Sequence, residues 1–61
     1  MISITAARET KDISLEDASR QLGISVETLR FFEKNPSEIN ISDAVMLTSL
    51  YKVEINSVRF F

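Results

Sequence analysis

The stretch Leu22-Gly23-Ile24-Ser25 decides how this chain folds. A glycine readily takes the left-handed backbone conformation that ends a helix, and a serine hydroxyl can accept a hydrogen bond from the first turn of the next helix. Upstream, Ser14 with Asp17 three residues later predicts a helix start of the capping-box type. The sequence therefore predicts two short helices, about residues 14–22 and 26–34, joined by the tight turn of a helix-turn-helix.

Further helical elements are predicted on both sides of this pair. Residues 3–11 are expected to form a first helix capped by Ser3. Residues 35–37 form a loop, because the residue before a proline is kept out of the helical region. A fourth helix begins at Asn40 or at Ser42; Asn40 is preferred because Ile39 and Ala44 can then contact each other across its start. A last short turn is expected over residues 57–61.

The expected inner faces follow from helical spacing. On the fourth helix, apolar and small residues recur at this spacing and are expected to face the core: Ile41, Ala44, Leu47, Thr48 and Tyr51. A second set is assigned to the core by default: Met46, Ser49, Tyr51, Val58, Phe60 and Phe61. With one glycine and one proline in 61 residues, the whole chain is expected to be one all-α domain, residues 1–61.

Composition excludes several function classes. The chain has no cysteine and no histidine, which excludes a disulfide framework, a thiolate nucleophile, a Cys/His zinc site and a histidine general base. Its carboxylates are scattered singly over the helices, whereas acid–base catalysis and metal binding need convergent groups. We therefore expect no enzyme activity, no cofactor, no metal and no small-molecule substrate.

Charge and hydropathy indicate where the protein works and how stable it is. The net charge of −2 argues against non-specific binding of nucleic acid. No apolar run is long enough to cross a membrane, and residues 1–5 lack the pattern of a signal peptide, so a cytoplasmic protein is expected, in a bacterial cell or a phage-infected host. A chain of 61 residues hides only about 60 % of its surface on folding, so it is marginally stable or is helped by a partner.

The order and spacing of several short motifs resemble one family. These motifs are Ala7-Arg8-Glu9, Ile13-Ser14, Leu22-Gly23-Ile24-Ser25, Thr28-Leu29, Glu33 and Leu50-Tyr51-Lys52-Val53. Together they resemble the lambda-repressor-like helix-turn-helix domains of the Cro/XRE type, especially short phage-associated transcriptional regulators, over residues 4–61. The resemblance implies a compact domain of four to five helices that binds double-stranded operator DNA in a sequence-specific manner, as a phage- or prophage-related repressor. It also implies an ion pair between Arg8 and Glu33.

The chain departs from the usual family pattern at three positions. Leu15 stands where the family usually has a glutamine that contacts DNA. Ser19 replaces an alanine, and its hydroxyl is expected to bond to a carbonyl one turn earlier. Asn35 replaces a glycine and is expected to keep the left-handed backbone that asparagine tolerates.

The predicted DNA-binding residues lie at the start of the helix of residues 14–22 and on and around the helix of residues 26–34, with the latter helix in the major groove. They are Ser14, Leu15, Ser25, Val26, Glu27, Thr28, Arg30, Phe31, Lys34 and Asn35. Each such domain presents few cations, so a homodimer on two half-sites is expected. One alternative is a protein-interaction module that keeps the fold without binding DNA, favoured by the acidic balance, Leu15 and the apolar Val26 and Phe31.

A second alternative is a MerR-like or excisionase-like DNA binder. Residues 23–33 also resemble the recognition helix of MerR-type activators. Those proteins continue into a basic wing, whereas this chain continues into a fourth helix, so this interpretation ranks lower.

Overall fold

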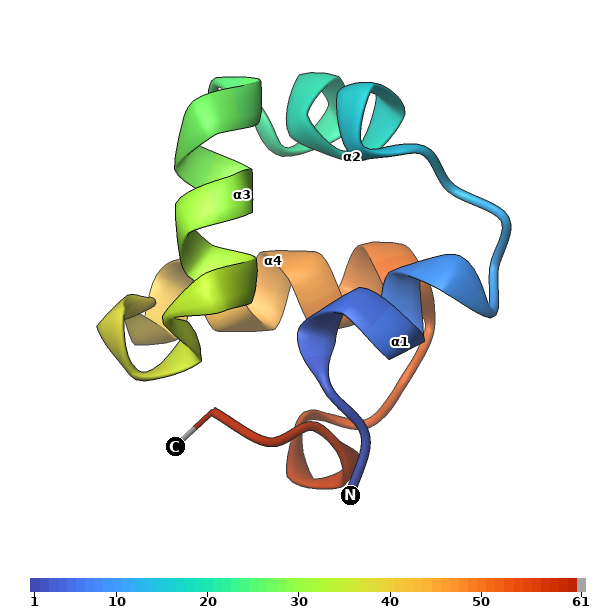
Figure 1. Cartoon of the computed structure of the whole chain (residues 1–61). Helices are drawn as coiled ribbons and strands as arrows, with labels where there is room; N and C mark the ends of the chain where they lie inside the picture. Colours follow the sequence, from blue (N-terminus) through green and yellow to red (C-terminus); the bar gives the residue numbers. More distant parts are fainter. Residues whose placement is uncertain (61) are drawn as a thin grey trace.

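The computed structural model describes residues 1–60, and in this range the chain is helical (Figure 1). Four α-helices are followed or interrupted by short 3₁₀ turns, with these bounds: α1 Ile4–Glu9, α2 Leu15–Leu22, α3 Val26–Lys34, η1 Pro36–Glu38, α4 Ile41–Tyr51 and η2 Ile55–Ser57. The predicted all-α fold class is confirmed. The helix-turn-helix lies where it was predicted, over α2 and α3.

Each α-helix begins at a side chain that accepts a hydrogen bond from the amide three residues later. The cap oxygens lie 3.0 Å from that amide at Ser3, Ser14 and Ser25, and 2.8 Å at Asn40. The prediction of Asn40 over Ser42 is confirmed. In a full capping box the side chain of Asp17 would also accept a hydrogen bond from the Ser14 amide. The Asp17 carboxylate instead accepts a hydrogen bond from the Arg20 guanidinium.

The helix ends were only partly predicted. Gly23 ends α2 with a φ of +73°, as expected. Lys52 ends α4 with a φ of +57°, and Asp12 has the same φ in the turn that closes α1 at Glu9, before the expected end at residue 11. The expectation for Asn35 is wrong. Its φ is −131°, because the chain turns directly into η1 there, and the Asn35 amide and side chain both donate to the Phe31 carbonyl.

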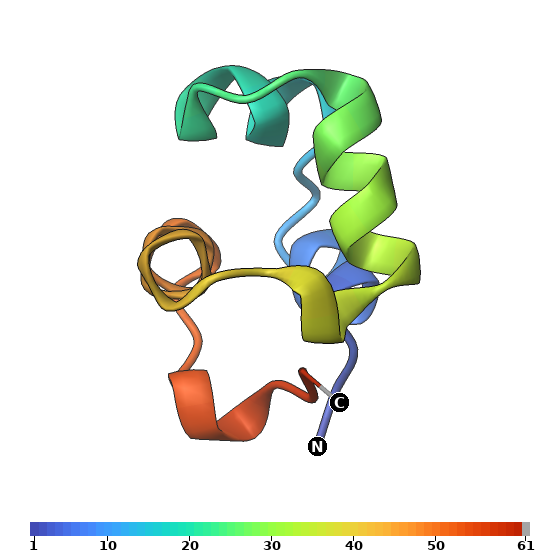
Figure 2. The same ribbon diagram turned by 90° about the vertical axis from the view of Figure 1, so that its left-hand side faces the viewer.

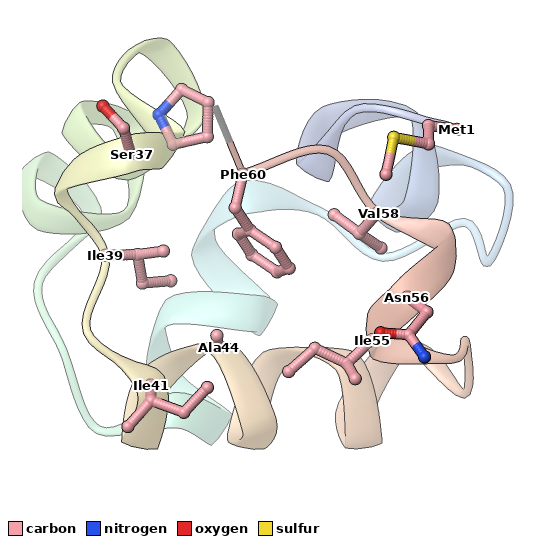
Figure 3. A pocket seen from close by; sticks show the side chains of 10 residues that line it. Met1, Ser37, Ile39, Ile41, Ala44, Ile55, Asn56, Val58 and Phe60 are labelled. Carbon is pink, nitrogen blue, oxygen red and sulfur yellow. The ribbon is translucent and has the colours of Figure 1, made fainter.

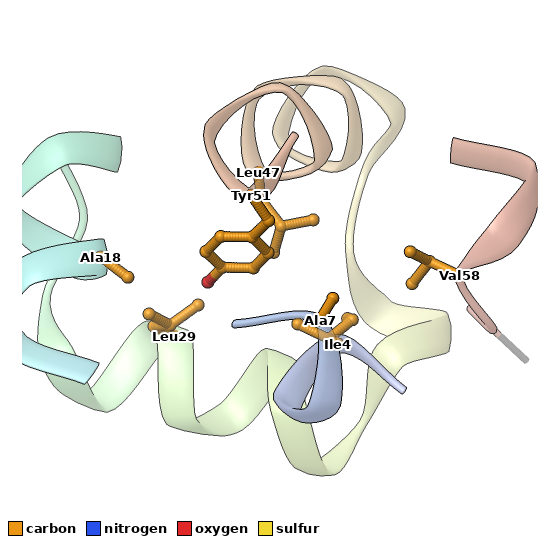
Figure 4. Packing of buried hydrophobic residues seen from close by; sticks show 7 residues of the cluster. All are labelled: Ile4, Ala7, Ala18, Leu29, Leu47, Tyr51 and Val58. Atoms are coloured by element: carbon orange, nitrogen blue, oxygen red, sulfur yellow. The ribbon is translucent and has the colours of Figure 1, made fainter. Parts of the chain in front are cut away.

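Side chains from all four α-helices and from the C-terminal segment meet in one core (Figure 4). The buried members of this core are Ile4, Ala7, Ala18, Leu29, Leu47, Tyr51 and Val58. Tyr51 is the largest of them, and its ring lies between the α2–α3 pair and α1. The core therefore holds the helix-turn-helix and the rest of the fold together as one body.

Three residues of α4 that were assigned to the core are exposed. Ile41 has 72 % of its surface accessible, and Met46 and Ser49 are exposed as well. The buried stripe of α4 is formed by Ala44, Leu47, Thr48 and Tyr51, and the other helices pack on that side. Helical spacing predicted these four buried residues correctly but also included Ile41, which is exposed.

The predicted last turn over residues 57–61 is shifted. The chain forms η2 over Ile55–Ser57 and then runs extended, so that Val58 pairs with Ile2 in an isolated parallel bridge. The Ile2 amide donates to the Ser57 carbonyl at 2.9 Å, and the Arg59 amide donates to the Ile2 carbonyl at 2.8 Å. Val58 is buried and Phe60 packs in part against the core, as expected; Phe61 lies outside the described residues.

Candidate nucleic-acid interface

The helix α2 and the first turn of α3 form the end of the molecule opposite η2, and α3 runs from there back toward α1 (Figures 1 and 2). Leu29 anchors α3 because its side chain is fully buried. Ala18 and Ser19 form the buried side of α2, and small residues there let the two helices approach. The Ser19 hydroxyl donates to the Glu16 carbonyl at 2.9 Å, which confirms the predicted bond and satisfies this buried group. The pair is thus held from within, and its outer side is left to solvent.

The outer side of α3 carries most of the predicted contact residues. Four of them are exposed on the helix, namely Glu27, Arg30, Phe31 and Lys34. Ser14, Ser25 and Asn35 are exposed at the helix ends, whereas Leu15, Val26 and Thr28 are only partly accessible. Seven of the ten predicted residues are therefore exposed on α2, α3 or at their ends, and three are partly covered.

Two of these partly accessible residues have a structural partner. Leu15 packs against the core and has no hydrogen-bonding group, so the anchoring bond that a glutamine would make is not available. Thr28 is bonded to the cap of its own helix: its hydroxyl accepts from the Ser25 hydroxyl at 2.8 Å, and its amide donates to the same oxygen at 3.0 Å. Leu15 and Thr28 are thus held in place by contacts within the protein.

Charges on the surface are mixed in sign. Arg30 and Lys34 are four residues apart, which places them on the same side of α3. Glu27 lies one turn before Arg30, near the start of the helix, where a carboxylate suits the helix dipole. On α2, Arg20 pairs with Asp17 across the solvent-exposed side. The cations free to meet phosphate on α3 are therefore Arg30 and Lys34.

The far end of α3 is fixed to α1 by an ion pair that was predicted from the family resemblance. Arg8 Nε lies 2.8 Å from Glu33 Oε2, and Arg8 Nη2 lies 3.3 Å from Oε1. The hydrogen bond with Glu33 raises the pKa of Arg8 above its ordinary value, although burial acts in the opposite direction. The pair confirms the prediction and joins the last turn of α3 to α1.

Two further groups in this network were missed by the sequence analysis. The Thr5 hydroxyl donates to Glu33 Oε1 at 2.9 Å, and Arg8 Nη1 donates to the Ile13 carbonyl at 2.8 Å. Thr5 stands three residues before Arg8, on the same side of α1, and that spacing was the available signal. The bond to the Ile13 carbonyl could not be predicted, because residue type does not show which backbone carbonyl accepts a side-chain hydrogen bond.

Within residues 1–60, no three Asp or Glu side chains come together in a way that could hold a metal ion. No helix in the same range combines the length and the apolar character needed to cross a membrane.

Comparison with known proteins gives one result. A family model described as helix-turn-helix matches residues 4–58, which is nearly the whole chain and includes all ten predicted contact residues. No curated protein and no solved structure gives a significant match.

Proposed function

Because the chain belongs to the Cro/XRE-type helix-turn-helix family of DNA-binding regulators, we propose that it binds a specific operator with α3 in the major groove. The resemblance to short phage-associated regulators further supports a role as a phage- or prophage-related repressor. One observation carries the proposal. The helix α3 is held by fully buried Leu29, and its opposite side exposes Glu27, Arg30, Phe31 and Lys34. These residues give α3 a side that can face base edges and phosphates.

The exposed side chains suit separate tasks in a groove. The Glu27 carboxylate can accept from a cytosine N4 amine, and the Phe31 ring and the Val26 methyls can contact thymine methyl groups. Arg30 and Lys34, one turn apart, can neutralise backbone phosphates. Base contacts near the start of α3 and phosphate contacts toward its end are consistent with a recognition helix that enters the groove by its N-terminal end.

Charge also supports a homodimer on DNA. The net charge is −2, and each copy offers two unpaired cations on α3, so one copy neutralises few phosphates. Two copies on half-sites about one helical turn apart, roughly 34 Å, combine their contacts without any new residue. We therefore propose that the operator is a two-fold repeat of one half-site.

A binding experiment tests the proposal. Fluorescence anisotropy would compare labelled DNA from the region flanking the protein's own coding sequence with a scrambled duplex, at two salt concentrations. A matched pair of variants assigns the surface. Lys34→Gln should weaken binding to both duplexes. It should also lower the slope of log K against log salt concentration by about one for each phosphate contact removed. Lys52→Gln, at the far end of α4, should change neither (Figure 1).

The competing function is a protein-docking surface on the same helix. It is favoured by Phe31, which is exposed on α3 and whose ring centroid lies 6.2 Å from that of the neighbouring Phe32, with the two rings tilted by 56°. Binding that is equally weak for every duplex at low salt would contradict operator recognition. Phe31→Ala would then be expected to abolish binding to a protein partner, with little dependence on salt.

A further inference from the structure

The start of α3, residues 25–29, offers acceptors and apolar groups but few side-chain hydrogen-bond donors. Ser25 and Thr28 carry the only hydroxyls there, and their two oxygens lie 2.8 Å apart. One of the two hydroxyl protons is used in that bond, and the Ser25 oxygen also accepts from the Thr28 amide at 3.0 Å. The pair therefore keeps a single proton for a ligand. One hydroxyl donor can bond to purine N7, guanine O6 or thymine O4, so it does not distinguish the bases.

The side chains that recognise purines are absent from the start of α3. Arginine and lysine bind guanine, and asparagine and glutamine bind adenine, through pairs of hydrogen bonds. None of these residue types occurs among residues 25–29. At the start of α2, the position after the cap holds Leu15, which has no hydrogen-bonding group. Purine edges therefore find no matching pair of groups at the start of α3.

Two exposed side chains of α3 match pyrimidines instead. Glu27 and Phe31 are four residues apart, which places them on the same side of the helix. An ionised carboxylate only accepts hydrogen bonds, and cytosine presents its N4 amine as a donor in the major groove. Adenine presents an amine too, but next to the acceptor N7, to which a carboxylate has nothing to donate. The apolar group that a base offers to the Phe31 ring is the 5-methyl group of thymine.

We propose that α3 reads the pyrimidine edges of its half-site, with Glu27 on a cytosine amine and Phe31 on the 5-methyl group of a neighbouring pyrimidine. This step rests on the proposed function and names the bases that the same surface selects. A phenyl ring has no hydrogen-bonding group, so it recognises the methyl group and not the base that carries it. 5-Methylcytosine has the same group at the same ring position as thymine. The site should therefore accept 5-methylcytosine in place of thymine.

The charge of Glu27 supports contact with a base over contact with the backbone. Within residues 1–60, no ion pair joins Glu27 to Arg30, although the two lie one turn apart on α3. An unpaired carboxylate among phosphates opposes binding, whereas an amine at a base edge offsets its charge with a hydrogen bond. Arg30 and Lys34, in the later turns, are left for the phosphates.

Modified bases test the methyl contact on the wild-type chain. Selection from a library of random duplexes gives the half-site, and each thymine in it is then replaced by uracil, which lacks only the methyl group. At one thymine the affinity measured by fluorescence anisotropy should fall about fourfold, the value for burial of one methyl group. Four base pairs are then compared at that position: T·A, 5-methylcytosine·G, U·A and C·G. The two methylated pairs should bind alike and about fourfold more tightly than the two others.

The cytosine contact is tested in the same duplex. N4-methylation replaces the amine proton that faces the groove and keeps the base pair with guanine. At one cytosine it should weaken wild-type binding by at least about tenfold, because a hydrogen bond to a charged acceptor is lost. The same modification should not affect Glu27→Ala. Replacement of each purine by its 7-deaza analogue, which removes the N7 acceptor, should change the affinity by less than about twofold.

A matched pair of variants assigns the methyl contact to α3. Phe31→Ala should bind the four base pairs alike, because the ring that distinguishes them is gone. Ile41→Ala is the control, since it removes another exposed apolar side chain, at the edge of the hollow between η1 and η2 (Figure 3). It should keep the preference for the methylated pairs. Circular dichroism shows that each variant is folded, and the results with modified bases on the wild type do not depend on any variant.

The possible failures of the two proposals are distinguishable. A wild-type chain that binds the selected duplex no better than a scrambled one would overturn the proposed function, and pyrimidine reading with it. Sequence-specific binding with equal affinity for the four base pairs would overturn pyrimidine reading alone. Larger losses with 7-deazapurines than with uracil, or a methyl preference that Phe31→Ala retains, would also overturn it and leave the proposed function standing.

Discussion

Arg8 and Glu33 form a two-point contact between α1 and α3, with 12 % and 9 % of their side-chain surfaces exposed. The contact crosses 25 positions of sequence and joins the first helix to the last turn of the proposed recognition helix. Thr5 and the Ile13 carbonyl supply further hydrogen bonds to the same pair. An ion pair so enclosed is sensitive to the loss of either partner, because the remaining charge stays buried.

Arg8→Ala should therefore destabilise the protein by about 3–5 kcal/mol, a large part of what a domain of this size possesses. Thermal unfolding followed by circular dichroism should show a fall in Tm of well over 10 °C, since about 1 kcal/mol corresponds to roughly 4–8 °C here. Arg20→Ala, which breaks the exposed pair with Asp17, is the control and should shift Tm by only a few degrees. Equal shifts in the two variants would show that enclosure of the Arg8–Glu33 pair does not matter.

Tyr51 makes stability dependent on alkaline pH. Burial raises its pKa from 10.0 to about 12, and the nearby Glu33 carboxylate acts in the same direction. A raised pKa means that the contribution to stability is fully present below pH 10 and is lost as pH rises through about 12. The loss corresponds to roughly 2–3 kcal/mol. Unfolding free energy measured from pH 9 to about 12 should fall more steeply in the wild type than in Tyr51→Phe.

The same substitution makes a second measurement possible near neutral pH. Among the described residues, the buried Tyr51 hydroxyl has no hydrogen-bond partner. Burial of an unpaired hydroxyl costs free energy, so Tyr51→Phe should leave Tm unchanged or raise it. In the wild type, which has one tyrosine and no tryptophan, the absorbance of tyrosinate at alkaline pH reports the titration of this single group. A substantial fall in Tm would indicate that the hydroxyl is bonded in solution.

Gly23→Ala tests the turn between α2 and α3. A Cβ added at Gly23 would meet no atom within 4 Å, so the substitution causes no clash. The φ of +73° is nevertheless unfavourable for a residue with a Cβ, and the cost is about 1–2 kcal/mol. Gly23→Asn should cost less, because asparagine tolerates this conformation better. Thermal melts that rank alanine above or equal to asparagine in stability would contradict this account of the turn.

Glu27→Ala tests base recognition by α3. Removal of this exposed carboxylate should relax discrimination at one base position of the operator, since its acceptor for a cytosine amine is gone. Affinity for unrelated DNA should stay the same or rise, because a charge that repels phosphate has been removed. Anisotropy titrations with single-base operator variants give the ranking. An unchanged order of affinities among these variants would show that Glu27 does not take part in base recognition.

Helix boundaries were predictable because capping is a local matter. Ser14, Ser25 and Asn40 cap their helices through an amide only three residues away, so sequence order alone brings the groups together. Gly23 is recognisable for the same reason, since its left-handed backbone is a property of the residue itself. Asp12 and Lys52 adopt that conformation too. Aspartate tolerates it better than most residues, whereas a lysine gives no local sign of it.

The sequence by itself determined the all-α fold, the helix-turn-helix and, through a family resemblance, the Arg8–Glu33 pair. Only the tertiary structure decided which residues of α4 are covered, because exposure depends on how far the neighbouring elements extend and not on residue type. Ile41 shows this most clearly: helical spacing placed it in the core, yet η1 and η2 leave a hollow beside it. The pairing of Ile2 with Val58 likewise joins segments whose order in the chain carries no sign of their meeting. Contacts within one turn of a helix can be read from spacing, whereas those between distant segments arise only when the whole core closes.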